Sequence, residues 1–87
     1  MKAVITVVGN DCVGIIAAVS GVLSENKVNI LDISQTIMQD MFTMIMLVDM
    51  GGADVKKVSD KLQETAKQMG LSIHVQNEEL FNSMHRI

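Results

Sequence analysis

The segment from Gly9 to Ile16 carries the residues with the clearest capacity for binding chemistry. It follows a β-branched run that ends at Val8, and its apolar end opens a helical pattern. A helix that begins here presents free backbone N–H groups, which favour a carboxylate or a phosphate. Asp11 could meet an ammonium group, and Gly14 lets a ligand approach the backbone. An α-amino acid carries both charged groups on one carbon. The competing interpretation is structural: Asp11 only caps the helix and Gly14 only packs.

Catalysis and metal binding would need residues that this sequence does not bring together. Cys12 is the only cysteine, and the two histidines, His74 and His85, lie far from it in the sequence. The predicted helix N-terminus would activate the Cys12 thiol. No histidine lies near it in the sequence to act as the base of a Cys–His pair. Soft-metal carriers pair two thiolates, and the eight methionines are better explained as fillers of an irregular core. We expect no catalytic residue, no metal site and no cofactor.

Length and composition indicate one small soluble domain. The chain has 87 residues, 7 basic and 10 acidic side chains and a net charge of −3, with two Phe and neither Tyr nor Trp. Nucleic-acid binding favours basic patches and aromatic stacking residues, so no nucleic-acid partner is expected. No apolar run reaches the ~18 residues of a membrane-spanning helix, and a single cysteine forms no internal disulfide. These features predict a cytoplasmic protein without membrane contact.

Hydrophobic periodicity predicts the elements around this loop. The run 3–8 is β-branched and apolar on both faces, and 41–50 is also apolar on both faces, so both are predicted to be central strands. Asp11 is the candidate N-cap of the first helix, and Asp54 and Gly70 mark the ends of the second. The predicted elements are strands over 3–8, 28–38, 41–50 and 71–76 and helices over 13–26 and 55–69.

Two further patterns add detail to these elements. A switch of parity between Ile30 and Ile33 predicts a β-bulge near Leu31–Asp32. The first helix carries an apolar stripe and, on another side, a stripe of small residues. The small stripe fits either the close approach of a neighbouring subunit or packing against the second helix. The apolar stripe is Ile15, Ile16, Val19, Val22 and Leu23, and the small stripe is Gly14, Ala17, Ala18 and Gly21.

The order of elements is β-α-β-β-α-β, which predicts the α+β ferredoxin-like fold: a four-stranded antiparallel sheet with two helices on one face. The open face of this sheet carries an apolar strip, which a monomer seldom leaves exposed. We divide the chain into a domain over 1–76 and a short C-terminal helix over 77–87, which packs on the domain or on its dimer mate. The apolar side of that helix comprises Leu80, Phe81, Met84 and Ile87.

Two short motifs give the chain a family resemblance. The segment Asp11-Cys12-Val13-Gly14-Ile15-Ile16 follows the first strand, and Asn29-Ile30 starts the second. These motifs, with the order of elements over 1–76, resemble the ACT domain, a small-molecule-sensing module of amino-acid metabolism. The chain is most similar to stand-alone ACT proteins with a short C-terminal helix. It is also similar to the ACT parts of the glycine cleavage system regulator and of formyltetrahydrofolate deformylase.

The resemblance implies a regulatory homodimer without catalytic activity. ACT domains pair, often edge to edge through the second strand and the first helix, and effector amino acids bind at that interface. In serine-binding members the contacts fall at the positions matching Asp11 and Asn29. Two departures are Val13, where the family usually has Pro, and Gly9, where serine-binding members carry His, which argues against serine itself. The implied ligand-binding residues are Asn10, Asp11, Cys12, Val13, Gly14, Ile15, Asn29 and Leu31.

Two functions remain in competition at the level of sequence. The first is a sensor that binds an amino acid or a related small metabolite at a dimer interface. The second is a protein–protein interaction module built on the same dimer but without a ligand. The expected partners are a second copy or a higher multiple of this chain, the small metabolite, and a regulated enzyme or regulator protein. The dimer geometry, edge to edge or face to face, stays open.

Overall fold

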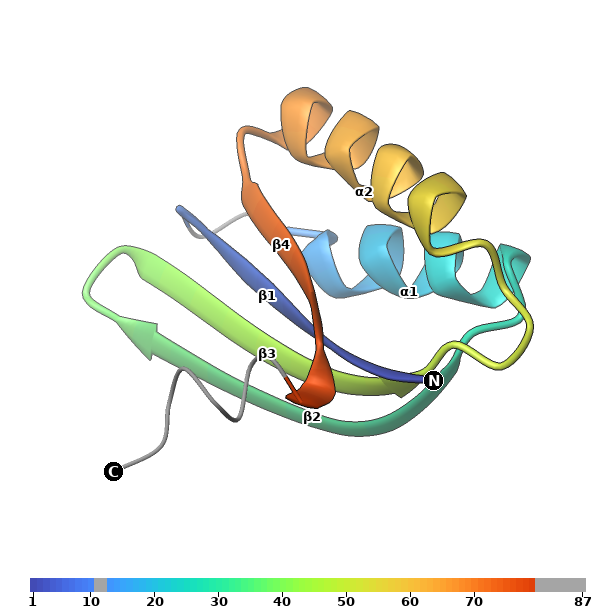
Figure 1. Cartoon of the computed structure of the whole chain (residues 1–87). Coiled ribbons are helices and arrows are strands. Elements are labelled where there is room, and N and C mark those ends of the chain that lie inside the picture. Colours follow the sequence, from blue (N-terminus) through green and yellow to red (C-terminus); the bar gives the residue numbers. More distant parts are fainter. Residues whose placement is uncertain (11–12, 80–87) are drawn as a thin grey trace.

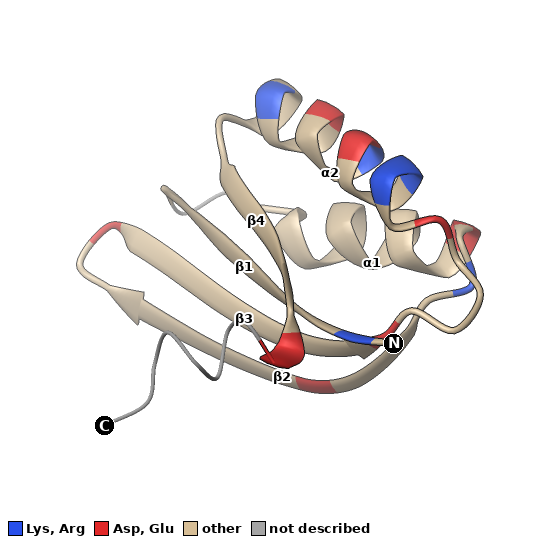
Figure 2. Cartoon of the chain, in the orientation of Figure 1, with Lys and Arg blue, Asp and Glu red and all other residues tan. Residues whose placement is uncertain are grey.

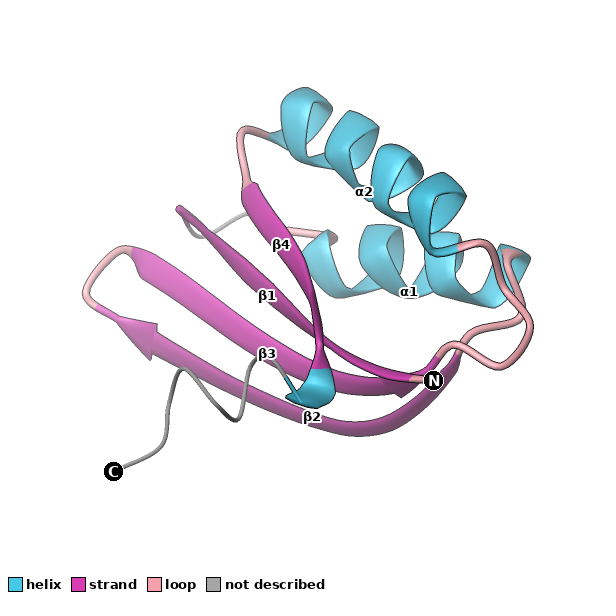
Figure 3. Ribbon diagram, viewed as in Figure 1, coloured by secondary structure: helices cyan, strands magenta, loops and turns pink. Residues whose placement is uncertain are grey.

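The computed structural model describes residues 1–10 and 13–79 and shows one antiparallel sheet with two helices on one of its faces (Figure 1, Figure 3). The strands lie in the order β2-β3-β1-β4. This is the ferredoxin-like arrangement, so the predicted fold class is confirmed. The elements are β1 (Lys2–Asn10), α1 (Ile15–Glu25), β2 (Asn29–Met38), β3 (Met41–Asp49), α2 (Val55–Met69) and β4 (Ser72–Asn77).

The core lies between the sheet and the helices, and the two central strands supply much of it. β1 and β3 pair along their whole length, and their side chains on the helix face of the sheet are buried. Met44 and Met46 are fully buried and Met50 is 1% exposed, which confirms that methionines fill this core. Flexible thioether side chains suit irregular gaps. The buried helix-face side chains of β1 and β3 are Ala3, Ile5, Val7, Phe42, Met44, Met46 and Val48.

The first helix begins later than predicted, and its N-cap is Gly14 rather than Asp11. Gly14 has φ 89° and ψ 4°, a left-handed conformation that glycine adopts at little cost. Ile16 belongs to the predicted apolar stripe but is 41% exposed, because successive residues point about 100° apart around a helix. The prediction of Asp11 as cap is therefore wrong, and Ile16 does not share the buried side of the helix with the rest of the predicted stripe. The helix buries Ile15, Val19 and Leu23.

The second helix follows its sequence signals. A side-chain oxygen of Asp54 accepts hydrogen bonds from the backbone N–H groups of Lys56 at 3.0 Å and Lys57 at 3.4 Å, so α2 has the predicted N-cap. It ends at Gly70, also as predicted. Charged residues recur along α2 (Figure 2), and all of them are exposed, which leaves the opposite side for the core. The side chains that α2 buries are Val58, Leu62 and Ala66.

β2 forms one edge of the sheet, with β3 as its neighbour. Its register against β3 shifts between Ile30 and Asp32, which confirms the predicted bulge. Because of the bulge, Ile30 and Ile33 both lie on the helix face of the sheet. A turn at residues 39–40 closes the hairpin, with Gln39 at φ 56°.

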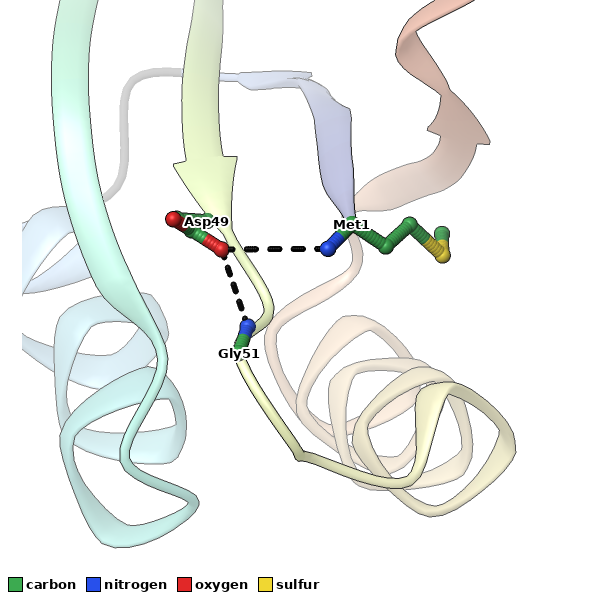
Figure 4. A network of polar contacts seen from close by, with 3 residues as sticks. All are labelled: Met1, Asp49 and Gly51. Carbon is green, nitrogen blue, oxygen red and sulfur yellow. Dashed lines mark hydrogen bonds and ion pairs between the residues drawn. The ribbon is translucent and has the colours of Figure 1, made fainter.

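A small polar network holds the turn after β3 (Figure 4). Oδ1 of Asp49 accepts a hydrogen bond from the Gly51 N–H at 3.0 Å and lies 3.9 Å from the α-amino group of Met1. The N–H of Met50 donates to the carbonyl oxygen of Met1 at 2.8 Å. Exposed ion pairs of this kind contribute about 0–1 kcal/mol. The network therefore serves mainly to hold the start of β1 against the end of β3.

Only the start of the predicted C-terminal helix lies within the described residues. Oδ1 of Asn77, the last residue of β4, accepts a hydrogen bond from the backbone N–H of Glu79 at 2.8 Å. Glu78 and Glu79 have helical backbone geometry. Residues 80–87 lie outside the described part of the chain, as do residues 11–12.

Candidate functional site

A hollow of about 280 Å³ lies where the start of α1 meets the β2–β3 hairpin. Three segments line it: the N-cap and first turn of α1, the second half of β2, and the beginning of β3. The left-handed conformation of Gly14 directs the chain into α1 and so sets the first turn of that helix beside the hairpin. The lining residues are Gly14, Ile15, Ile16, Ala17, Gln35, Ile37 and Phe42.

The hollow combines an apolar wall with the polar start of a helix. Among the described residues that line it, Gln35 carries the only polar side chain. At Gly14 no side chain makes a capping hydrogen bond in the described part of the chain, and the first turn of α1 has no acidic residue. Backbone N–H groups at a helix start lack intrahelical partners and carry partial positive charge. This end of the hollow therefore favours a negatively charged oxygen.

The structure brings part of the predicted ligand-binding set to this hollow. Gly14 and Ile15 line it. Val13 is fully exposed in the preceding loop, and Asn10 is exposed at the end of β1. Two predicted residues lie outside the described part of the chain: Asp11 and Cys12.

The two remaining predicted residues, Asn29 and Leu31, lie toward the opposite end of β2. Asn29 pairs with Asp49, whereas Gln35 of the hollow pairs with Met44. The strand between positions 29 and 35 spans roughly 20 Å at about 3.3 Å per residue. Within one chain, Asn29 and Leu31 are therefore not part of the hollow.

Sequence reasoning missed the strand side of the hollow. Gln35, Ile37 and Phe42 line it together with the start of α1, although they follow Gly14 by more than 20 positions in the sequence. The alternation of side chains along β2 could have identified the strand residues of the hollow. After the bulge at Leu31, odd-numbered residues of β2 face the helices, and they pair with the even-numbered core residues of β3.

Gly9 lies near the end of β1, against Leu71. A Cβ atom at position 9 would collide with Cδ2 of Leu71, so Leu71 occupies the space that a side chain there would need. Leu71 itself packs against the hydrophobic core. Position 9 is where serine-binding ACT domains carry histidine, and a histidine side chain at this position would require Leu71 to move.

Other polar groupings in the described part of the chain do not form a reaction centre. Ser72 Oγ and His74 Nε2 lie 3.3 Å apart, but both side chains are exposed. A shallow hollow of about 450 Å³ on the outer side of α2 is lined by Lys, Asp and Glu side chains of mixed sign. No group of three His, Cys, Asp or Glu residues among those described could hold a metal ion. Neither described helix has the length and apolar character needed to span a membrane.

Exposed large apolar side chains concentrate beside the hollow, on the free edge of β2. Ile33 and Ile37 are 40% and 61% exposed, and Ile16 of α1 is 41% exposed. An exposed apolar edge strand that lacks Lys and Pro is a template for pairing with another strand. We call this surface the edge patch; it consists of Ile16, Leu31, Ile33, Ile37 and Met38.

The strand order and the single layer of helices define a domain of the ferredoxin-like class, with a hollow at the start of α1. The family model described as "ACT domain" matches residues 2–76. The chain therefore belongs to the ACT domain family, and the resemblance stated from its motifs is confirmed.

Known proteins similar to the chain agree with this membership. It is 58% identical over 89 residues to a UPF0237 protein of Clostridium acetobutylicum, with the whole of both chains covered. An ACT domain protein from Streptococcus pneumoniae superposes with a TM-score of 0.80 and 38% identity, covering 93% of each chain. A protein described as a glycine cleavage system transcriptional repressor gives a TM-score of 0.78 and 27% identity, covering 86% of this chain and 44% of that one.

The formyltetrahydrofolate deformylase of Pseudomonas putida shares the fold alone. Its TM-score is 0.81 at 12% identity, covering 88% of this chain and 29% of the deformylase. The similarity to formyltetrahydrofolate deformylase that was expected from the sequence is therefore confirmed at the level of fold.

Proposed function

We propose that this protein is a non-catalytic, homodimeric sensor of the cytoplasm that binds an amino acid or a similar small metabolite at its dimer interface. The observation that carries this proposal is the position of the hollow, which shares Ile16 and Ile37 with the edge patch. A second copy that covers the edge patch would also close the hollow. Membership of the ACT domain family supports the same regulatory role.

The backbone of β2 supports two-fold pairing in one particular register. Residues that flank a two-residue turn bond to each other, and alternate residues of an edge strand turn their N–H and C=O groups outward. Counting back from the turn at 39–40, the outward residues are Ile37, Gln35 and Ile33. An antiparallel pair centred on Gln35 sets Ile33 of one chain opposite Ile37 of the partner subunit. Apolar side chains then face each other on both sides of the axis.

This pairing also brings the beginning of β2 of one chain to the hollow of the other. In an antiparallel pair, the beginning of one β2 strand runs alongside the end of the other. Asn29 and Leu31 lie at the beginning of β2, whereas Ile37 of the hollow lies near its end. Leu31 of the partner subunit, at the bulge, therefore approaches the hollow, whereas Asn29, which pairs with Asp49, comes alongside on the opposite face of the sheet.

The proposed ligand uses both the polar and the apolar parts of the hollow. Its carboxylate lies at the N-terminus of α1, next to Gly14, and its ammonium group is directed toward Asp11. A hollow with Gln35 as its one polar side chain among the described residues favours a ligand with a small apolar side chain. The wall for that side chain consists of Ile16, Ile37 and Phe42.

A thermal-shift screen with the twenty amino acids, followed by calorimetric titration, tests this function. A ligand that binds only the native state stabilises it by about 2.7 kcal/mol at 100 times its Kd. With the amino acid returned, Asp11→Asn should weaken binding about tenfold or more, because it removes the negative charge that faces the ammonium group. Asn29→Ala should also weaken binding, because the resemblance to serine-binding ACT domains implies a ligand contact at this position. Gln68→Ala, an exposed change on α2, is the control. A screen without any hit, or binding unchanged in both variants, contradicts the proposal.

The alternative is a protein–protein interaction module that uses the same surface without a small ligand. It is favoured by the apolar composition of the edge patch and by the shortage of polar side chains in the hollow. In that case the dimer persists, no amino acid raises the melting temperature, and the Asn29→Ala variant has no binding phenotype. The same screen thus separates the two functions.

A further inference from the structure

The two edges of the sheet differ in what lies across them. β2 forms one edge and β4 forms the other. An edge strand turns a row of backbone N–H and C=O groups outward, and such a row is a template for pairing with a strand of another molecule. Most of the edge patch lies on β2, whereas β4 is in contact with α2 (Figure 1). A sheet with two open edges can add copies without end, so the state of the β4 edge decides whether assembly closes.

Strand pairing determines which backbone groups of β4 face outward. In an antiparallel sheet, a central strand bonds alternately to its two neighbours, and the N–H and C=O groups of one residue point the same way. Met41 flanks the hairpin turn and bonds to β2, so β3 uses its even-numbered residues to bond to the odd-numbered residues of β1. The even-numbered residues of β1 therefore bond to the even-numbered residues of β4. It follows that Ile73 and Val75 turn their backbone groups away from the sheet.

A side chain of α2 binds one of these outward groups. Nε2 of Gln63 donates a hydrogen bond to the carbonyl oxygen of Ile73 at 2.7 Å, and the bond is partly shielded from solvent. The side chain of Ile73 is buried, and so is that of Leu62, which precedes Gln63 on α2. Core residues therefore hold both ends of this bond. The amide of Gln63 occupies the position from which the N–H of an added strand would donate to the same carbonyl.

Among the described residues, the β2 edge has no bond of this kind from another element. The N–H of Ile33 donates to Oδ1 of Asp32 at 2.9 Å, but that contact is exposed and lies within the strand. The Asp32 carboxylate can turn out to solvent without any movement of the fold, whereas Gln63 is fixed on a packed helix. A second strand can therefore displace the contact at β2 more readily than the one at β4.

We propose that Gln63 blocks the β4 edge and thereby restricts self-association of this chain to β2. An incoming strand would break the Gln63 bond, and a partly shielded amide left unpaired costs more than one new hydrogen bond contributes. Pairing through β2 alone gives a closed two-fold dimer, whereas alternating β2 and β4 contacts would give an open-ended sheet. The β2 part of this inference rests on the proposed dimer, and the β4 part rests on the Gln63 bond.

Sedimentation velocity of the full chain over a range of concentrations tests this role. Gln63→Ala removes the donor, so its mass should rise with concentration to about twice the wild-type value or more, because a symmetric contact at a second edge joins particles in pairs. Gln63→Lys keeps a donor and adds a charge at the edge, so it should match the wild type. Gln68→Ala, an exposed change on the same helix, is the matched control. A wild-type mass for Gln63→Ala at every concentration, or an equal rise in Gln68→Ala, overturns the proposal.

Hydrogen exchange separates edge pairing from a folding defect in the Gln63→Ala variant. The outward N–H groups of Ile73 and Val75 should exchange severalfold more slowly at high concentration than at low concentration, while the amides of α2 keep their wild-type protection. Faster exchange throughout α2 and β4 would instead assign Gln63 a role in folding and would overturn the proposal.

Both measurements are independent of the sensor function. Neither uses a ligand, and each compares Gln63→Ala with the wild type at whatever mass the wild type has. Failure of the Gln63 proposal therefore leaves the amino-acid sensor intact. A wild-type monomer would contradict the proposed dimer, whereas Gln63→Ala would still be expected to gain mass over it.

Discussion

At the scale of single residues, two glycines of the small stripe have different structural requirements. Gly14 adopts φ 89°, and its conformation starts α1. Gly21 lies inside the helix, and within the described part of the chain a Cβ atom there would meet nothing within 4 Å. Packing against α2 therefore does not require a glycine at position 21. We propose the close approach of a second subunit as the reason for it.

The two glycines should respond oppositely to alanine. Gly14→Ala should lower the free energy of unfolding by about 1–2 kcal/mol, because a Cβ atom is strained in the left-handed region. Gly21→Ala should raise it by roughly 0.5–1 kcal/mol, because alanine stabilises a helix interior relative to glycine. Urea unfolding by circular dichroism measures both values, at a concentration low enough to keep the protein monomeric. A loss of stability in both variants would show that the helix has no room at Gly21.

At the scale of elements, the parts predictable from sequence are those with local signals. α2 has a side-chain cap at Asp54 and a stop at Gly70, and its bounds match the prediction. α1 begins at the left-handed conformation of Gly14 rather than at a capping side chain, so the sequence pattern around Asp11 indicates the wrong N-cap. Only the helix side of the hollow could be predicted, because only that side has a local sequence signal. Its helix side follows from a contiguous motif, whereas Gln35 and Phe42 reach it only through strand pairing.

The cap of α2 gives a direct test at this scale. Asp54→Ala should lower the free energy of unfolding by about 1 kcal/mol, and Asp54→Asn should change it by less than about half of that, because Asn is an equally good N-cap. Chemical denaturation with matched slopes for the three proteins measures the difference. Equal losses in both variants would indicate that the carboxylate charge, and not the cap hydrogen bonds, stabilises the helix.

At the scale of the whole molecule, the proposed dimer predicts that the edge patch governs association. The chain has a mass of 9.5 kDa, and light scattering at micromolar concentration should give twice that value or a higher multiple. Ile33→Lys should shift the protein toward the monomer, because it places a charge opposite Ile37 of the partner subunit. Gln68→Lys is the control, with the same added charge on the exposed side of α2. A wild-type monomer, or identical masses for all three proteins, would contradict edge pairing.

The methionines of this fold also divide it into two zones of chemical reactivity. Met38 and Met41, beside the hairpin turn, are 69% and 48% exposed, while Met44 and Met46 have no exposed surface. In the monomer, a peroxide reaches the first pair in the folded state and the second only when the sheet and helices separate. Sulfoxide at the hairpin would make that corner polar while the core stayed intact. Sulfoxide at Met44 or Met46 would instead record how often the whole domain opens, so the oxidation rate of these two side chains measures the opening of the core.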